Sequence, residues 1–203
     1  AFNYYILLEY CPGKSVKELL RKSENGRLSE DEAKRILRDV VMGVVYLHNH
    51  KVIHRDLKLE NFMIGADGKI KIADFGISRR LSYADEKRFS ICGTPQYLSP
   101  ELLQTTNTGH SYEVDIWAIG VCAYTMLTGR QPFDAGVKKL TYEAIKSCNY
   151  QFPSTIPLSA AAKDFIQVVL KINPKKRPNA IDLANHKFLC SFGPSSPPKP
   201  KSI

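Results

Sequence analysis

A helix start signal followed by a long run of helically spaced apolar residues restricts the possible folds more than any other feature. Ser29 and Glu32 form an S-x-x-E capping box, in which each side chain satisfies a backbone N–H group at the start of a helix. The apolar residues that follow are Ile36, Leu37, Val40, Val41, Val44, Val45 and Leu47. Because these positions share one face, the pattern predicts a long helix packed deeply against other elements.

Short strands are expected after that helix, and helices dominate the rest of the chain. Ile70 and Ile72 alternate with lysines behind an Ala-Asp-Gly turn at residues 66–68, which predicts a small hairpin. Further helices are expected over residues 15–22, 114–127, 139–147, 159–171 and 180–185. The apolar residues 4–8 predict a strand that ends at Pro12 and Gly13. The predicted class is therefore mainly α, and α+β overall.

Composition argues against several other classes of protein. The longest apolar stretch, residues 114–127, is shorter than the roughly 20 residues of a membrane span, so no membrane partner is expected. The five cysteines are scattered and form no C-x-x-C pair, which argues against a zinc site or a disulfide framework and favours an intracellular compartment. The formal charge is +9, but Lys and Arg are interleaved with acidic and apolar residues, so no nucleic-acid partner is expected.

Two polar motifs flank the predicted hairpin. His-Arg-Asp-Leu-Lys-Leu-Glu-Asn at residues 54–61 precedes it, and Asp-Phe-Gly at residues 74–76 follows. The Asp56 carboxylate could accept a hydroxyl proton, and Lys58 could meet a phosphate. The amide oxygen of Asn61 and the carboxylate of Asp74 are hard ligands suited to Mg²⁺. A lone loop Asp is usually a turn former, but the joint pattern favours a shared chemical role.

With these motifs in order, residues 2–189 resemble the C-terminal lobe of a eukaryotic Ser/Thr protein kinase. The resemblance implies transfer of the ATP γ-phosphate to Ser or Thr hydroxyls of proteins, with Mg²⁺ as the metal. It implies that Asp56 acts as the base and that Asn61 and Asp74 hold the metal. It also implies a kinase-like C-terminal lobe with one remaining strand of the N-terminal lobe. Residues 1–190 would form this partial domain, and residues 191–203 a Pro/Ser-rich tail.

The resemblance assigns further roles along the chain. Glu9 and Cys11 would lie in the hinge whose backbone holds adenine, and Met63 would form the floor beneath the ring. Thr94 would contact the catalytic Asp and Lys, as in enzymes that act on Ser and Thr. Three residues would be structural: Glu101, within a Ser-Pro-Glu variant of A-P-E, would pair with Arg177, and Asp115 would tie down the catalytic loop from below.

Regulation and specificity are also implied by the resemblance. Ser90 stands where related kinases carry an activating phosphosite, and its phosphate could gather Arg55 and Arg79. Ile77, directly after the Asp-Phe-Gly motif, implies a preference for Thr over Ser acceptors. Segments 109–115, 124–127 and 141–150 resemble Polo-like kinases most and Aurora-like kinases next, although Glu60 replaces the usual Polo-like Gly. A Polo-like kinase would act in the cytoplasm, and in the nucleus or at the centrosome.

A complete kinase also has a glycine-rich loop, a strand lysine and a helix glutamate before the hinge. The three residues before Tyr4 hold none of these, so the sequence reads as a chain cut before the hinge and is expected to be inactive alone. A second interpretation is a truncated or inactive kinase that binds proteins through the helical groove around residues 138–147. Nucleic-acid binding, a third, has only the net charge in its favour.

Overall fold

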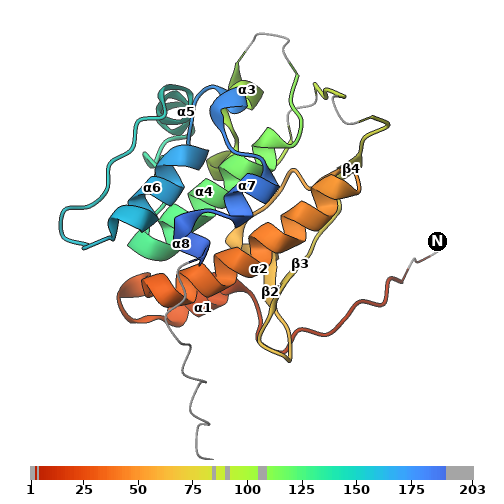
Figure 1. Cartoon of the computed structure of the whole chain (residues 1–203), viewed down its shortest axis with the longest axis horizontal. Helices are drawn as coiled ribbons and strands as arrows, with labels where there is room; N and C mark the ends of the chain where they lie inside the picture. The colour runs from red at the N-terminus through yellow and green to blue at the C-terminus, as the bar shows by residue number, and fades with distance from the viewer. Residues whose placement is uncertain (1–2, 4, 84–85, 90–91, 105–108, 191–203) are drawn as a thin grey trace, which may run out of the picture.

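The computed structural model describes residues 3, 5–83, 86–89, 92–104 and 109–190 (Figure 1). Its helices are α1 (Val16–Lys22), α2 (Glu30–Asn49), α3 (Pro100–Leu103), α4 (Glu113–Thr128), α5 (Lys138–Ser147), α6 (Ala160–Val169), α7 (Ala180–Ala184) and α8 (Lys187–Cys190). Its strands are β1 (Val52–Ile53), β2 (Phe62–Ile64), β3 (Ile70–Ile72) and β4 (Arg79–Arg80). Single 3₁₀ turns cover Glu24–Gly26, Leu59–Asn61, Pro95–Tyr97 and Pro174–Lys176. The mainly α class predicted from the sequence is confirmed.

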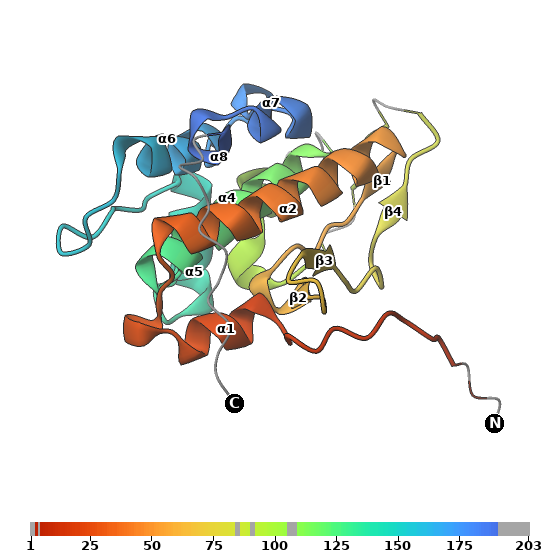
Figure 2. The same cartoon turned by 60° about the horizontal axis from the view of Figure 1, so that its bottom comes forward.

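The long helix α2 begins at the predicted capping box. Ser29 Oγ accepts a hydrogen bond from the Glu32 backbone N–H at 3.3 Å, and a Glu32 carboxylate oxygen accepts one from the Ser29 N–H at 3.3 Å. The apolar face of α2 packs against α4, α7 and β3, with α6, α7 and α8 on one side and α1 on the other (Figure 2). No helix of the described residues is long and apolar enough to cross a bilayer.

Two small antiparallel sheets position the loops between them. In the predicted hairpin, β2 pairs with β3, and Ile64 lies opposite Ile70. The hairpin packs closely on α2, where a Cβ on Gly43 would lie only 2.8 Å from Ile72 Cδ1. The second sheet was not predicted: β1 pairs with β4 so that Ile53 lies opposite Arg79. This pair brings residues 79–80 back to the end of α2.

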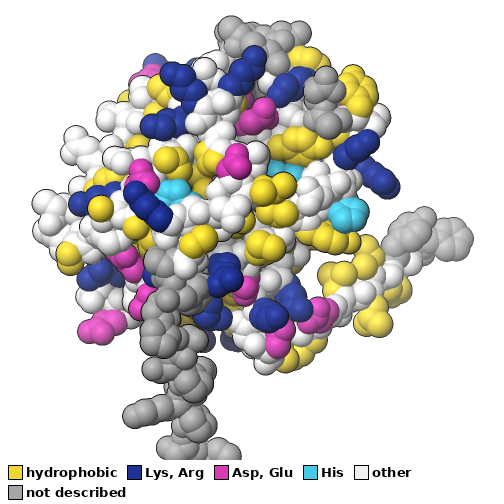
Figure 3. All heavy atoms as spheres, viewed as in Figure 1, with side chains coloured by type: hydrophobic (Ala, Val, Ile, Leu, Met, Phe, Trp, Pro, Cys, Tyr) yellow, Lys and Arg dark blue, Asp and Glu magenta, His cyan; other side chains and the backbone are white. Residues whose placement is uncertain are grey.

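The strand predicted for residues 4–8 is not formed. Tyr4 lies outside the described residues, and residues 5–10 extend away from the lobe without strand pairing (Figure 2). The side chain of Leu7 is 99% exposed and that of Tyr5 is 90% exposed, and Figure 3 shows the hydrophobic side chains of this segment projecting from the rest of the structure. An apolar pattern alone does not make a strand, because the backbone N–H and C=O groups need a neighbouring strand.

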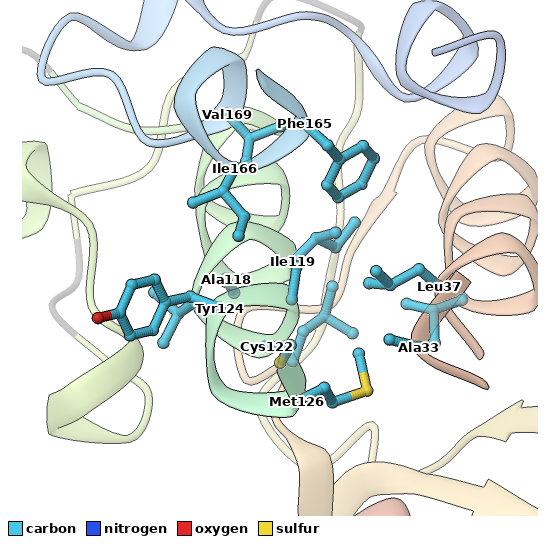
Figure 4. Packing of buried hydrophobic residues seen from close by; sticks show 14 of the residues in the cluster. Ala33, Leu37, Ala118, Ile119, Cys122, Tyr124, Met126, Phe165, Ile166 and Val169 are labelled. Atoms are coloured by element: carbon cyan, nitrogen blue, oxygen red, sulfur yellow. The ribbon is translucent and has the colours of Figure 1, made fainter. Parts of the chain in front are cut away.

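The core is centred on α4, a helix that is apolar on all sides. Every residue from Val114 to Thr128 is buried, which is the pattern of a helix surrounded by other elements. Figure 4 shows Ile119 and Met126 of α4 facing Leu37 of α2, with Phe165 of α6 beyond them. Because α4 is enclosed, the polar residue near its start, Asp115, is held in a fixed place beneath the loop that follows β1.

Candidate active site

Asp115 anchors the loop between β1 and the 3₁₀ turn at residues 59–61. One of its carboxylate oxygens accepts hydrogen bonds from the backbone N–H of His54 at 3.0 Å and from His48 Nε2 at 2.9 Å. The other oxygen accepts the Arg55 backbone N–H at 2.9 Å. Burial raises the pKa of Asp115, but the bonds from His48 and the two backbone groups outweigh this and hold the pKa below its ordinary value. The carboxylate is therefore ionised, and it fixes the loop.

Asp56, Lys58 and Thr94 form one hydrogen-bonded cluster at the end of that loop. Asp56 Oδ1 accepts hydrogen bonds from the Thr94 backbone N–H at 2.9 Å and from Thr94 Oγ1 at 2.7 Å. Lys58 Nζ donates to Asp56 Oδ2 at 2.5 Å and lies 3.0 Å from Thr94 Oγ1. Partial burial raises the pKa of Asp56, but the hydrogen bonds from Lys58 and Thr94 outweigh this and lower the pKa below its ordinary value, so the group is ionised. The structure thus brings all three predicted residues together.

His54 links the two sequence motifs. Its ring is buried, and Nε2 donates a hydrogen bond to the Ala73 carbonyl at 3.0 Å, so Nδ1 is the acceptor for the Asp56 backbone N–H at 3.3 Å. The His54 and Phe75 rings meet edge to face, with centroids 5.0 Å apart. His54 and the Asp115 partner His48 were not singled out from the sequence. His54 opens the motif at residues 54–61, which was a usable signal, whereas no local pattern marks His48.

Asn61 and Asp74 fit the predicted metal-ligand roles in their donor chemistry. Asn61 is 6% exposed, and its Nδ2 donates to the Asp56 carbonyl at 2.9 Å, which leaves the amide oxygen available. Asp74 is exposed, with a left-handed φ of 62°, and Oδ1 accepts the Gly76 N–H at 3.2 Å. The described residues contain no group of three or more His, Cys, Asp or Glu side chains that could hold a metal. Mg²⁺ does not require one, because it takes few protein ligands and keeps waters or phosphate oxygens.

The residues predicted to surround adenine lie along one face of the hairpin. Met63 lies opposite Lys71 across the β2–β3 pair, so their side chains share a face. Lys71 Nζ is 3.4 Å from Glu9 Oε1, which holds residue 9 on the same side of the hairpin. Cys11 Sγ points to the Glu9 carbonyl at 3.9 Å. Glu9 and Met63 therefore lie on one side of the hairpin, and Cys11 follows Glu9 by two residues.

Glu101 of α3 and Arg177 form a buried, bidentate ion pair. Arg177 Nη1 and Nη2 each donate to one Glu101 oxygen at 2.7 Å, and the Arg177 side chain is 0% exposed. Arg177 also donates to the carbonyls of Lys171 and Glu113, both at 2.9 Å, and its guanidinium stacks over Trp117 at 4.9 Å. This pair fixes α3 against α4 and the segment before α7.

The predicted regulatory residues are described only in part. Ser90 lies outside the described residues. Arg55 Nε donates to the Ile77 carbonyl at 2.7 Å, and Arg55 has a left-handed φ of 70°. Arg79 lies exposed in β4 opposite Ile53, two residues before Arg55. Arg79 thus lies in the strand that pairs with β1, and Arg55 follows β1 by two residues.

A helical lobe with this loop, hairpin and buried Glu–Arg pair has the architecture of a phosphotransferase catalytic lobe. The protein kinase domain model matches residues 2–189, and the chain belongs to the protein kinase family. It is 43% identical over 92% of its length to the probable serine/threonine-protein kinase CCRP1 of maize. It is 45% identical over 92% of its length to serine/threonine-protein kinase PLK2 of mouse, and 42% identical over 92% to serine/threonine-protein kinase polo of Drosophila melanogaster.

These matches confirm the resemblance to Ser/Thr kinases and to the Polo-like group. The chain covers 29% of the maize protein, 26% of the mouse protein and 31% of the fly protein. It therefore spans less than a third of the length of these relatives.

Proposed function

We propose that this chain supplies the catalytic half of a Ser/Thr protein kinase that transfers the γ-phosphate of ATP to Ser or Thr hydroxyls of proteins. The observation that carries the proposal is the Asp56–Lys58–Thr94 cluster. One carboxylate oxygen of Asp56 accepts both Thr94 donors, and the other pairs with Lys58. The base, the cation and a threonine from the segment before α3 thus form one unit.

The lowered pKa of Asp56 defines what this carboxylate can do. A weak base does not remove a proton from a substrate hydroxyl at rest, but an ionised carboxylate accepts its hydrogen bond and aligns the oxygen for in-line attack. The proton then passes to Asp56 as the oxygen–phosphorus bond forms and the hydroxyl becomes acidic. Lys58, beside the same carboxylate, offsets negative charge on the phosphoryl group in transfer.

Asn61 and Asp74 are the residues we propose to hold Mg²⁺. Bound there, Mg²⁺ would neutralise charge on the phosphate oxygens of ATP. The Asn61 side chain is fixed by its bond to the Asp56 carbonyl, so metal and base positions are tied through one short segment. The adenine would be held by the backbone near Glu9 and Cys11, over Met63.

Kinase activity of the natural full-length protein tests this proposal. Asp56→Asn should lower kcat by about 10²- to 10⁴-fold, the range lost with a positioned proton acceptor. Thr94→Val, which removes the hydroxyl bonds to Asp56 and Lys58, should lower kcat about tenfold, while the matched variant Thr94→Ser should stay near wild type. Equal rates for Asp56→Asn and the wild type, with both proteins folded, would rule out the assigned role.

Finer features of the same function are proposed from the family resemblance. Phosphorylation of Ser90 would order its segment by pairing with Arg55 and Arg79, and Ile77 would favour Thr acceptors. Ser90→Ala should then reduce the activity of protein that has been phosphorylated, and a peptide array should favour Thr. Equal activity of the phosphorylated wild type and Ser90→Ala would exclude the role of Ser90. Equal use of Ser and Thr peptides would exclude the preference for Thr. Action inside the cell, without nucleic-acid or membrane partners, belongs to the same proposal.

A polypeptide of residues 1–203 alone should bind ATP weakly. Residues 5–10 are exposed, and a small-molecule site normally encloses about 70–90% of its ligand. The division into a domain over residues 1–190 and a tail over 191–203 stays a prediction, because the tail lies outside the described residues.

The alternative is a protein-binding module without phosphoryl transfer. Val137 and Leu140, at the start of the α5 segment (residues 138–147), are 56% and 49% exposed, which gives this alternative an apolar surface. A full-length protein that binds its partner but transfers no phosphate, with Asp56 intact, would favour it.

A further inference from the structure

A cavity lies on the side of the lobe where α2, α4 and α7 meet. It has a volume of about 440 Å³ and opens to the surface, and its walls come from the end of α2, the start of α4, the 3₁₀ turn at Pro174 and the start of α7. Val45, Ile116, Pro174, Pro178 and Ile181 give it mainly apolar walls. Its volume lies within the range of about 300–1,000 Å³ for small-molecule sites. None of the residues proposed for phosphoryl transfer lines this cavity.

Aromatic rings form one wall of the cavity. His48 and Tyr112 both line it, and their rings lie 4.7 Å apart at an interplanar angle of 49°. Hydrophobic side chains are exposed on this face around α2 and α7 (Figure 3), and Ile181 beside the cavity is 53% exposed. Flat rings and proline side chains suit the faces of a planar apolar molecule, which gains by offset or edge contacts with them.

Among the described residues, the charged side chains around the cavity are paired except for Lys175. Arg177 and Glu113 line the cavity, but Arg177 is paired with Glu101, and Glu113 Oε1 lies 3.1 Å from Lys87 Nζ. Lys175 also lines it, is exposed, and forms no ion pair within the described part of the chain. The wall therefore carries an excess of positive charge at Lys175, beside apolar and aromatic surface.

We propose that this cavity is a binding site for a compact aromatic acid. Its ring lies against His48, Tyr112 and the two prolines, and its anionic group meets Lys175. The site is separate from the proposed ATP and substrate site and does not depend on the kinase activity. Its effect reaches the catalytic loop, because His48 also donates to the Asp115 oxygen that holds the His54 backbone N–H.

Titration of the 203-residue chain with 2-naphthoate, followed by calorimetry, tests the site. The uncharged analogue 2-naphthylmethanol and two matched variants serve as comparisons. Ile181→Glu places a carboxylate at the cavity, while Ile172→Glu does so at a similarly exposed residue that does not line it; their side chains are 53% and 45% exposed. We expect saturable one-site binding for the wild type and Ile172→Glu, and at least about tenfold weaker binding for Ile181→Glu.

Lys175→Ala tests the anionic group. It should weaken 2-naphthoate about 2- to 5-fold, the effect of one exposed charge, and leave 2-naphthylmethanol unchanged. NMR shifts of the His54 and Arg55 amides should follow the same binding curve, since both amides bond to Asp115. Binding that does not saturate, or that is equal in Ile181→Glu and the wild type, overturns the site. If Lys175→Ala weakens the binding of 2-naphthoate and 2-naphthylmethanol equally, the choice of an acid is overturned. If the His54 and Arg55 amide shifts do not change on binding, the link to the catalytic loop is overturned.

Discussion

Removal of the Arg177 side chain should cost more stability than removal of any exposed cation on this chain. Arg177→Met keeps an apolar side chain of similar length but deletes the guanidinium. The Glu101 side chain, 5% exposed, is then left as a buried carboxylate without its bidentate partner. The carbonyls of Lys171 and Glu113 lose their donors at the same time.

The expected loss follows from that burial. Breaking a buried ion pair by removing one partner costs about 3–5 kcal/mol, because the remaining charge stays out of water. The total free energy of unfolding of a domain is about 5–15 kcal/mol, so the loss is a large part of it. Lys187→Met is the matched control: Lys187 Nζ is 2.9 Å from Asp164, but the two side chains are 64% and 41% exposed. An exposed pair contributes only about 0–1 kcal/mol.

Urea unfolding measured by the fluorescence of Trp117, the only tryptophan of the sequence, compares the two variants. Adding Glu101→Leu to Arg177→Met should recover part of the loss, because the orphaned charge is then gone as well. The reasoning from burial would be refuted if Arg177→Met lost no more free energy of unfolding than Lys187→Met. It would also be refuted if adding Glu101→Leu lowered the stability of Arg177→Met by a further loss of the same size.

Substitutions at three further positions test the loop anchor, the core and the capping box by urea unfolding. The pKa of Asp115 is lowered in the folded state, so its contribution to stability is complete above the unfolded-state pKa of about 3.9 and is lost as the pH falls through the lower folded-state pKa. The stability deficit of Asp115→Asn should therefore be large at pH 7 and shrink below about pH 4. A deficit that stays constant with pH contradicts this reasoning. Gly120→Ala should lose about 1–3 kcal/mol despite the helix preference of Ala, because its Cβ would lie 2.5 Å from Val169 Cγ2, and a gain in stability would exclude the clash. Ser29→Ala should cost about 0.5–2 kcal/mol, and Ser29→Asp, which keeps a capping oxygen, much less; equal losses would contradict the capping role.

Local rules predicted the elements that have strong local signals. The capping box at Ser29 and the alternation at Ile70 and Ile72 depend on neighbours within a few residues, so α2 and the β2–β3 hairpin could be predicted from the sequence. The β1–β4 sheet could not, because its two-residue strands include the exposed Arg79 and Arg80, which have no apolar pattern. The four-residue helices α3 and α8 are too short to show a period.

The candidate site divides in the same way. Asp56, Lys58, Asn61 and Asp74 could be found because they lie in two short motifs with fixed spacing. The role of His48 could not be found from the sequence, because its hydrogen bond goes to Asp115, 67 residues away. Nothing local to His48 distinguishes it from His50, whose Nδ1 bonds only to the Tyr46 carbonyl of its own helix at 2.8 Å. Long-range hydrogen bonds of this kind depend on how α2 packs on α4.

The loop at residues 54–61 is held from both sides, and this explains how Arg55 keeps its unusual backbone. A left-handed φ of 70° at a non-glycine residue costs of order 1–3 kcal/mol. Asp115 accepts the backbone N–H groups of both His54 and Arg55, and a hydrogen bond to a charged group contributes about 1.5–3 kcal/mol. Two such bonds are enough to offset the strain. Asp56 then follows directly after a fixed backbone and accepts hydrogen bonds from Thr94 on the other side, so the fold itself orients its carboxylate.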